Sequence, residues 1–173
     1  MDREGLKKII RDIPDFPKEG IIFKDITTLL NDAAALRSSI ILLTEECKKY
    51  SVSKVVGIES RGFILGVPIA LELNAGFVPI RKPGKLPADT ISETYDLEYG
   101  TDSIEMHRDA INPGEKVIII DDLLATGGTA KAASTLVEKI GGEVELIIFM
   151  IELTFLKGRE KLGGRNLFSL IEY

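Results

Sequence analysis

The feature that most constrains the fold of this chain is an apolar run that ends in two acids and a glycine-rich turn. It reads Val117-Ile118-Ile119-Ile120-Asp121-Asp122-Leu123-Leu124-Ala125-Thr126-Gly127-Gly128-Thr129. Four apolar, mostly β-branched residues predict a strand that is buried on both faces, which is typical of a parallel sheet. A helical pattern begins directly after the turn. The segment therefore predicts a strand, a turn and a helix in succession.

Two kinds of ligand group meet at this turn. Asp121 and Asp122 stand at the carboxyl end of the predicted strand, where open α/β sheets bind their ligands. Residues 125–129 are small, glycine or hydroxyl residues whose backbone N–H groups can surround an anion beside the positive end of the next helix. This arrangement suits a ribose 5-phosphate. The segment is neither a Walker-A loop nor a Gly-x-Gly-x-x-Gly loop, and the alternative is an ordinary strand–turn–helix with incidental acids.

Composition limits the other classes of protein that the chain can represent. Its 173 residues predict one domain spanning 1–173, and 45% hydrophobic with 28% charged residues is typical of a globular protein. A net charge of −5 argues against a nucleic-acid-binding surface. One cysteine suits a reducing compartment. Since no apolar stretch is long enough to span a membrane and residues 1–4 lack a signal-peptide pattern, we expect a cytoplasmic protein without a membrane or nucleic-acid partner.

Strand and helix patterns alternate through most of the chain. A strand, a helix and a second strand in succession predict a right-handed parallel crossover. We therefore expect an α/β domain with a parallel sheet and helices on both faces. Cys47 lies on the apolar face of one helix, so we expect a packed thiol rather than a nucleophile. The expected helices are 6–13, 32–50, 62–73 and 129–140, and the expected strands are 55–58, 77–80, 117–120 and 144–151.

Residues 82–111 depart from this alternation. A loop rich in proline, glycine and lysine precedes two segments, 95–99 and 103–108, whose polar and apolar residues alternate as in a β-hairpin. An inserted hairpin beside the ligand-binding edge predicts a lid. The alternative is a structural flap or a dimer arm. We expect His107 to be a solvated strand residue without a catalytic role.

Cationic residues follow the other two predicted strands. Arg61 comes after the strand 55–58, whereas Arg81 and Lys82 come after the strand 77–80, with Lys85 on the next loop. The carboxyl ends of parallel strands meet at one edge, so we expect these cations near the paired acids. Arg61 offers a bidentate fork for a phosphate, and the cations suit a leaving diphosphate. The alternatives are a surface pair of Arg61 with Glu59 and a solvated loop for the two lysines.

The segment 117–129 resembles the 5-phosphoribosyl-1-diphosphate (PRPP) motif of the type I phosphoribosyltransferases. The resemblance implies that Asp121 and Asp122 bind the ribose hydroxyls. It also implies the fold of that family: a parallel sheet flanked by helices, an inserted β-hairpin flap at about 82–111 and a small N-terminal hood at about 1–30. The residues implied to bind the 5-phosphate are Ala125, Thr126, Gly127, Gly128 and Thr129.

Other segments resemble the adenine-specific branch of that family, the adenine phosphoribosyltransferases. This resemblance implies transfer of the phosphoribosyl group from PRPP to adenine, forming AMP and diphosphate in purine salvage. It also implies a homodimer and a requirement for Mg²⁺ that is held mainly by PRPP, without a certain protein ligand. A phosphoribosyltransferase for hypoxanthine, guanine or xanthine and a PRPP-sensing regulator remain alternatives. The resembling segments are Phe16–Ile26, Glu59–Phe63, Ile80–Pro87, Tyr95–Gly100 and Glu152–Leu162.

The same resemblance implies the roles of individual residues. Ile22 and Leu123 would lie on either side of the adenine ring, and the Phe23-Lys24 backbone would read its edge. Lys24 stands where many relatives carry arginine, so the side chain loses a planar fork. Glu98 and Tyr99 would come from the flap. Arg61, Arg81, Lys82 and Lys85 would bind the diphosphate, and the implied catalytic residues are Asp121, Asp122, Glu98 and Arg61.

Overall fold

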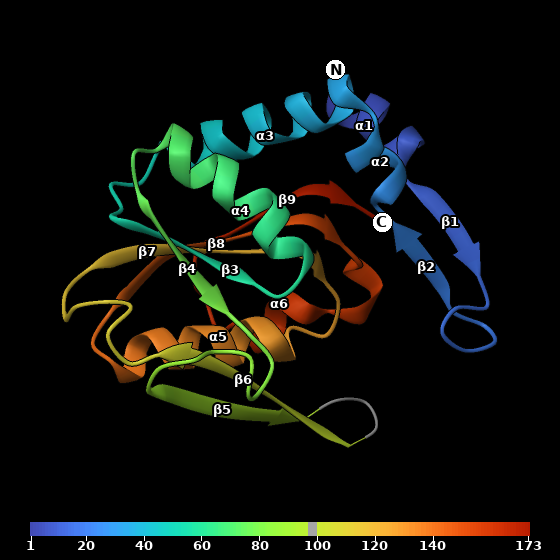
Figure 1. Ribbon diagram of the computed structural model, residues 1–173. Helices are drawn as coiled ribbons and strands as arrows, with labels where there is room; N and C mark the ends of the chain where they lie inside the picture. Colours follow the sequence, from blue (N-terminus) through green and yellow to red (C-terminus); the bar gives the residue numbers. More distant parts are fainter. Residues whose placement is uncertain (97–99) are drawn as a thin grey trace.

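The computed structural model describes residues 1–96 and 100–173, and it contains a central parallel sheet of five strands (Figure 1). This confirms the predicted α/β class. The last strand in the sheet was not predicted from the sequence. In sheet order the strands are β4 (Gly76–Ile80), β3 (Lys54–Ile58), β7 (Lys116–Leu124), β8 (Glu143–Glu152) and β9 (Leu167–Glu172).

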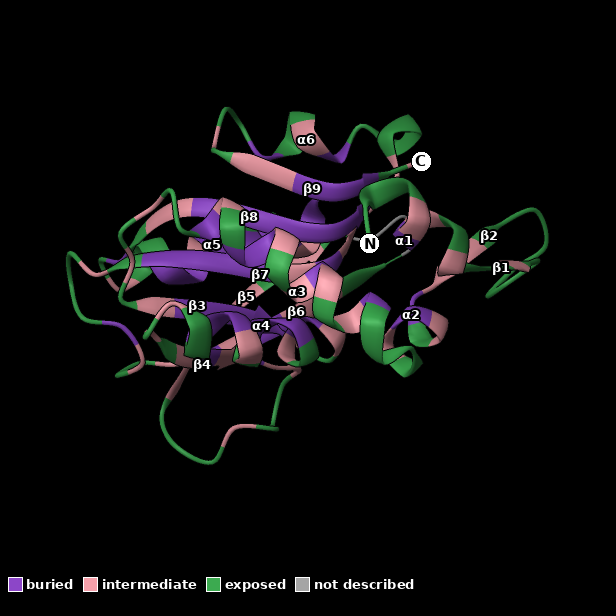
Figure 2. Cartoon of the chain, turned by 90° about the horizontal axis from the view of Figure 1, so that it is seen from above, coloured by how far each residue is buried: buried purple, intermediate pink, exposed green. Residues whose placement is uncertain are grey.

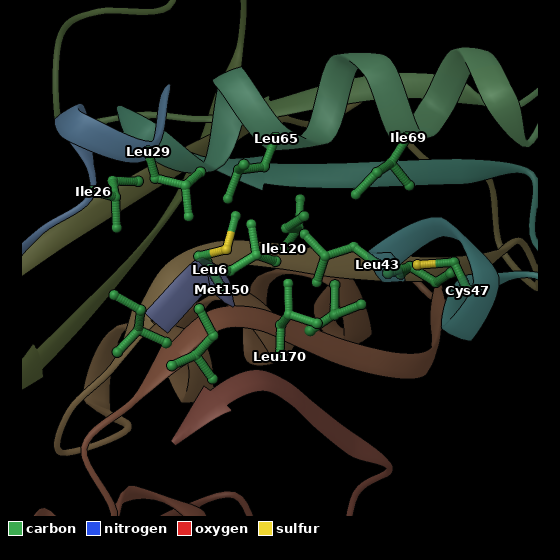
Figure 3. Packing of buried hydrophobic residues seen from close by; sticks show 14 of the residues in the cluster. Leu6, Ile26, Leu29, Leu43, Cys47, Leu65, Ile69, Ile120, Met150 and Leu170 are labelled. Carbon is green, nitrogen blue, oxygen red and sulfur yellow. The ribbon is translucent and has the colours of Figure 1, made fainter. Parts of the chain in front are cut away.

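Helices cover both faces of this sheet, as expected (Figure 1). On one face α3 (Ala33–Cys47) and α4 (Arg61–Glu72) lie over a core that includes Leu43, Leu65 and Ile120 (Figure 3). On the other face α5 (Gly128–Lys139) packs over a second core. The central strands β7 and β8 are mostly buried, whereas the edge strands β4 and β9 also carry half-buried and exposed residues (Figure 2). Two apolar faces explain why the strand at 117–120 carries no polar side chain.

Cys47 lies buried in the first core, which confirms the expected packed thiol. Burial raises the pKa of this thiol to about 12. The thiolate, which is the reactive form, is therefore scarce at neutral pH. Among the described residues, no helix has the length and apolar character needed to cross a membrane.

The N-terminal region forms a separate two-stranded ribbon beside the sheet (Figure 1). The expected helix over 6–13 is wrong in its extent, because α1 (Arg3–Ile9) ends before β1 (Arg11–Pro14). β1 pairs antiparallel with β2 (Ile22–Asp25), and this pairing holds residues 11–14 in an extended conformation. Pro14 also disfavours helical geometry at the residue before it. The short helix α2 (Thr27–Asn31) then leads from the ribbon to α3.

The inserted hairpin is present as β5 (Thr90–Asp96) and β6 (Thr101–His107), which pair antiparallel. Its first strand begins earlier than the expected 95. The reason is that β5 carries an apolar residue, Ile91, that is buried together with Ile104 and Met106 against the second core. His107 lies in β6 and is half-buried, and its Nε2 accepts a hydrogen bond from the Ala88 N–H at 3.4 Å.

The chain between β8 and β9 forms two short helical turns. A 3-10 turn (Thr154–Leu156) is followed by α6 (Gly158–Lys161), and both lie at the end of β8. Glu152 at the end of β8 is almost fully buried, although it is charged. Arg159 of α6 donates to both Glu152 carboxylate oxygens at 2.7 and 2.9 Å, and Ser169 of β9 donates to one of them at 2.6 Å. These bonds give both oxygens of the buried carboxylate a hydrogen-bond donor, and they hold α6 against the sheet.

Candidate active site

Three neighbouring strands, β4, β3 and β7, deliver polar residues to one edge of the sheet. Because the strands are parallel and adjacent in the order β4-β3-β7, the residues that follow them meet at their common carboxyl end. Asp121 and Asp122 lie within β7 rather than after it, since β7 continues to Leu124 through its pairing with β8. This edge brings the paired acids together with the residues that follow β3 and β4.

The two acids differ in their surroundings. Asp122 is buried, and its backbone N–H donates to Oδ1 of Asp121 at 2.9 Å. Burial and the neighbouring charge of Asp122 raise the pKa of Asp121 well above its usual range. Gly62, at the start of α4, lies so close that a Cβ there would stand 2.7 Å from the carbonyl oxygen of Ile120. The acids are therefore held against the α4 N-terminus by direct backbone packing.

The turn after β7 forms a small pocket of about 70 Å³. Gly127 adopts a left-handed conformation with φ 79°, which a residue with a side chain rarely adopts. Its Cα packs on Gly158 of α6, and a Cβ at either glycine would overlap a backbone carbonyl oxygen, of Gly158 or of Ala125. The lining residues are Asp121, Leu123, Leu124, Ala125, Thr126, Gly127, Gly128, Thr129, Ala130 and Phe149.

Gly158 is a site residue that the sequence did not assign. Gly158 begins α6, and its backbone packs directly against Ala125 and Gly127 of the turn, which fixes the position of the turn. The segment Glu152–Leu162 carried a family resemblance, but its role depends on a contact between residues about thirty positions apart. The only sequence signal was a glycine inside an otherwise charged stretch.

The cations of the edge are held by carboxylates. Nε of Arg61 donates to Asp122 at 2.5 Å, and Arg81 donates to both oxygens of Glu59 at 3.0 and 3.2 Å. The suggested surface pair of Arg61 with Glu59 is therefore wrong, since each residue has another partner. The Arg81 guanidinium lowers the pKa of Glu59. Lys85 lies on an exposed loop, where its carbonyl oxygen accepts from Arg81 at 3.1 Å.

Lys82 connects the same edge to the inserted hairpin. Its Nζ donates to Asp102 of β6, and the hydroxyl of Tyr95 donates to the same carboxylate at 3.2 Å. The ammonium of Lys82 lowers the pKa of Asp102. Lys82 is therefore not a freely solvated loop lysine. The sequence did not single out Asp102, because the pair joins residues on different elements.

The N-terminal ribbon reaches this edge through Phe23. The Phe23 ring lies 5.7 Å from the guanidinium carbon of Arg61 and packs edge-on against Phe16 with ring centroids 5.3 Å apart. Ile22, next to it, is 55% exposed. The Lys24 ammonium instead binds Asp12 at 2.7 Å.

The structure therefore brings Phe23 to the edge where Arg61 pairs with Asp122. The expected flap residues Glu98 and Tyr99 lie outside the described residues. Leu123 is half-buried in the lining of the pocket formed by the turn after β7. The edge thus combines paired acids, an anion-sized turn, bound cations and an aromatic ribbon residue.

Comparison with known proteins identifies the class of protein that has this arrangement. The family model described as the phosphoribosyl transferase domain matches residues 24–162. The chain belongs to the phosphoribosyltransferase family.

Similarity over nearly the whole chain narrows the assignment. The adenine phosphoribosyltransferase of Halothermothrix orenii is 60% identical over 96% of this chain and 98% of its own, and that of Crocosphaera subtropica is 59% identical over 97% and 99%. The crystal structure of the enzyme from Thermoanaerobacter pseudethanolicus superposes with a TM-score of 0.96 at 54% identity and 99% coverage of both chains. The Saccharomyces cerevisiae enzyme, complexed with adenine and an imino-altritol bisphosphate, gives 0.91 at 41% identity and 98% coverage of both. Within its family, the chain is one of the adenine phosphoribosyltransferases.

Proposed function

We propose that the protein transfers the 5-phosphoribosyl group from PRPP to adenine, releasing AMP and diphosphate in purine salvage. The observation that carries this proposal is the sheet edge itself. There an anion-sized turn, two adjacent carboxylates and the ribbon residue Phe23 converge. The yeast relative, crystallised with adenine and a bisphosphate, supports the same pairing of ligands.

In this reaction N9 of adenine attacks the anomeric carbon of PRPP while the bond from that carbon to the diphosphate oxygen breaks. The N9 proton leaves as the new C–N bond forms, and Glu98 is our candidate acceptor. Asp121 and Asp122 hold the ribose hydroxyls and stabilise positive charge that develops on the sugar. Residues 125–129 hold the 5-phosphate, which fixes the anomeric carbon for attack.

The cations at the edge take up charge on the leaving diphosphate. We assign this role to Arg61, Arg81, Lys82 and Lys85, which supply bidentate or point-charge contacts to phosphate oxygens. Three of these side chains, those of Arg61, Arg81 and Lys82, form ion pairs with carboxylates, which would fix their positions before the substrate binds. The diphosphate then replaces those carboxylates as the partner of the cations.

We assign Mg²⁺ as the cofactor and PRPP as its main ligand. The described residues contain no group of three or more His, Cys, Asp or Glu side chains that could hold a metal by themselves. Asp121 and Asp122 supply oxygen donors of the type that Mg²⁺ accepts when substrate phosphates and water complete its coordination. When bound, the ion neutralises charge on the diphosphate.

We assign adenine recognition to the ribbon. Ile22 and Leu123 cover the two faces of the base, and the backbone of Phe23 and Lys24 reads its edge. A backbone acceptor that faces the 6-amino group of adenine would face an oxygen in hypoxanthine, which leaves two acceptors unpaired. Such mismatches commonly discriminate by about 10⁴-fold, so we expect a preference well above about 10²-fold in kcat/KM.

The decisive experiment measures nucleotide formation from PRPP with adenine, hypoxanthine and guanine offered side by side. Selective formation of AMP supports the proposal. Equal use of adenine and hypoxanthine would contradict adenine specificity but leave PRPP transfer intact. PRPP binding without nucleotide formation would instead indicate a sensor.

We further propose that residues 1–173 act as one domain with a hood at about 1–30 and a flap at about 82–111. The flap would bring Glu98 and Tyr99 over the substrates and exclude water, which would otherwise hydrolyse PRPP. Amide exchange of β5 and β6 in the presence and absence of PRPP with an adenine analogue measures this closure.

We also propose that the protein is a cytoplasmic homodimer. The outer side of α4 exposes Ile64, Val67 and Leu71, at 46%, 44% and 76%, and Ile41 of the neighbouring α3 is 50% exposed. A stripe of this kind is typical of a surface that another protein covers. Sedimentation velocity on the wild type and on Leu71→Glu tests the dimer. The cytoplasmic location rests on the single, buried cysteine.

A further inference from the structure

Two consecutive residues of β2 contact the rest of the protein in different places. Successive side chains of a strand point to opposite faces. Phe23 accordingly reaches the guanidinium of Arg61, whereas the ammonium of Lys24 lies 3.9 Å from the ring centroid of Tyr173. The side chain of Lys24 is only 13% exposed, so this cation is largely withdrawn from water. Cation–π attraction is strongest for a desolvated ammonium of this kind.

Tyr173 is itself fixed to the edge of the sheet that carries the proposed active site. Its backbone N–H donates to the Glu152 carbonyl oxygen at 2.9 Å. Its own carbonyl oxygen accepts from the backbone N–H and the hydroxyl of Thr154 at 3.0 and 2.6 Å. Its phenol hydroxyl donates to the Lys7 carbonyl oxygen at 3.3 Å.

Glu152 and its neighbour in turn contact the strand with the paired acids. Leu124, the last residue of β7, pairs with Glu152, and its carbonyl oxygen accepts from the Leu153 N–H at 2.9 Å. A short chain of contacts therefore runs from the end of β7 through Glu152 and Tyr173 to Lys24. Figure 1 shows the end of the chain at the base of the ribbon, close to the end of β2.

We propose that Tyr173 is a positioning residue of the adenine subsite: its ring holds Lys24 and thereby sets the place of Ile22 and Phe23 over the sheet edge. This inference rests on the proposed function, in which those residues bind the base. The Tyr173 ring also lies 4.5 Å from the Lys7 ammonium, and none of its partners Lys24, Lys7, Glu152 and Thr154 lines the pocket of the turn after β7. Loss of Tyr173 should therefore affect adenine and not PRPP.

The test compares Tyr173→Leu with Tyr173→Phe. Leucine removes the ring, so we expect KM for adenine to rise about tenfold while KM for PRPP stays within about twofold. Phenylalanine keeps the ring and loses only the hydroxyl bond to Lys7, so it should restore near-wild-type KM values. Lys24→Met should reproduce the adenine defect, and the double variant with Tyr173→Leu should add little to it.

Phe168→Leu is the matched control. Phe168 lies on β9, the strand that Tyr173 directly follows, and the guanidinium carbon of Arg3 lies 5.0 Å from the centroid of its ring. That contact joins β9 to α1 and does not involve the ribbon, so both KM values should stay near wild type. Equal rises of the two KM values in Tyr173→Leu, or the same adenine defect in Phe168→Leu, would overturn the proposal.

Amide exchange of residues 22–25 gives a readout that does not depend on the reaction. Exchange there should be faster in Tyr173→Leu than in the wild type, and unchanged in Phe168→Leu. Unchanged exchange in Tyr173→Leu would overturn the positioning role even if activity falls. If the wild type forms no AMP, the proposed function fails, whereas faster exchange in Tyr173→Leu still supports the link between Tyr173 and the ribbon.

Discussion

The turn after β7 and the N-terminal ribbon serve the same proposed reaction with different construction. The turn is built from backbone atoms that pack on α6 and on a strand whose residues 117–120 are fully buried. The ribbon is largely exposed along β1, and it reaches the sheet edge through side chains such as Phe23 and Lys24. A buried backbone frame suits a ligand group that never varies, the phosphoribosyl moiety. Side-chain contacts on an exposed ribbon leave the base-reading part adjustable.

This comparison predicts that changes at the buried edge affect PRPP and the chemical step, whereas changes in the ribbon affect the base. The strongest test replaces both acids. Asp121→Asn with Asp122→Asn should leave the fold intact and lower kcat by about 10²-fold or more, because the charges that stabilise the sugar cation are lost. Glu45→Gln with Glu143→Gln is a control that changes the net charge equally on exposed positions outside the site and the flap. Wild-type turnover by the folded active-site variant would exclude the role of the acids.

Arg61 contacts both regions, through Asp122 of β7 and through Phe23 of the ribbon, so its replacement tests whether they bind different ligands. Arg61→Ala should weaken diphosphate and PRPP binding by about tenfold or more and adenine binding much less, since a charged phosphate contact is lost. Calorimetry with each ligand measures the difference. Arg165→Ala, which removes a pair with Glu138 at 2.7 Å, is the matched control and should change neither. Equal losses for adenine and diphosphate in Arg61→Ala would make Arg61 a structural residue.

Gly127→Ala tests the backbone frame. The new Cβ would overlap the Gly158 carbonyl oxygen and would occupy a left-handed conformation. We expect KM for PRPP to rise about tenfold, with little change for adenine, because the turn must shift. Gly164→Ala separates the two causes, since Gly164 has φ 80° and no atom within 4 Å of its Cβ position. A rise of the same size in the control would mean that the overlap with Gly158 is unimportant.

The smallest expected effect concerns stability. An Asp whose pKa rises on folding binds its proton more tightly in the folded state. Its protonation therefore stabilises the folded state fully at pH values below the ordinary pKa of 3.8. This stabilisation is lost as the pH rises through the higher pKa of the folded state. Asp121→Asn removes a carboxylate that is partly desolvated and repelled by Asp122, and it should increase the free energy of unfolding at pH 7 by about 1 kcal/mol. Thermal melts should show this gain shrinking as the pH falls towards 4, and a lower Tm at pH 7 would contradict the argument.

Local patterns were sufficient to predict the central part of the fold. The run at 117–120 is apolar on both faces, so it could only be a buried strand, and the hairpin was visible in its alternation. Strand β9 was missed because Ser169 interrupts its apolar pattern. Ser169 is buried only because it donates to Glu152 of β8 and accepts from Arg159 at 3.3 Å. Such partners come from distant parts of the chain.

The same limit applies to the candidate site. The sequence indicated which residues follow the strands, and the structure places Arg61, Arg81 and Lys82 at the expected edge. The sequence did not indicate the partners of these cations, because Arg61 pairs with an acid 61 positions away and Arg81 with one 22 positions away. Gly158 and Tyr173 were missed for the same reason. Their effects depend on packing between elements that only the folded chain brings together.

The ion pairs at the sheet edge have a consequence for how the protein responds to salt. Arg61, Arg81 and Lys82 already have carboxylate partners, so these cations do not need a dense layer of solution anions. A phosphate ligand that replaces a carboxylate partner releases few counterions, and the dependence of affinity on ionic strength reflects the number released. The affinity for PRPP should therefore change little with ionic strength. Internal acids would then act as the resting counterions of the enzyme.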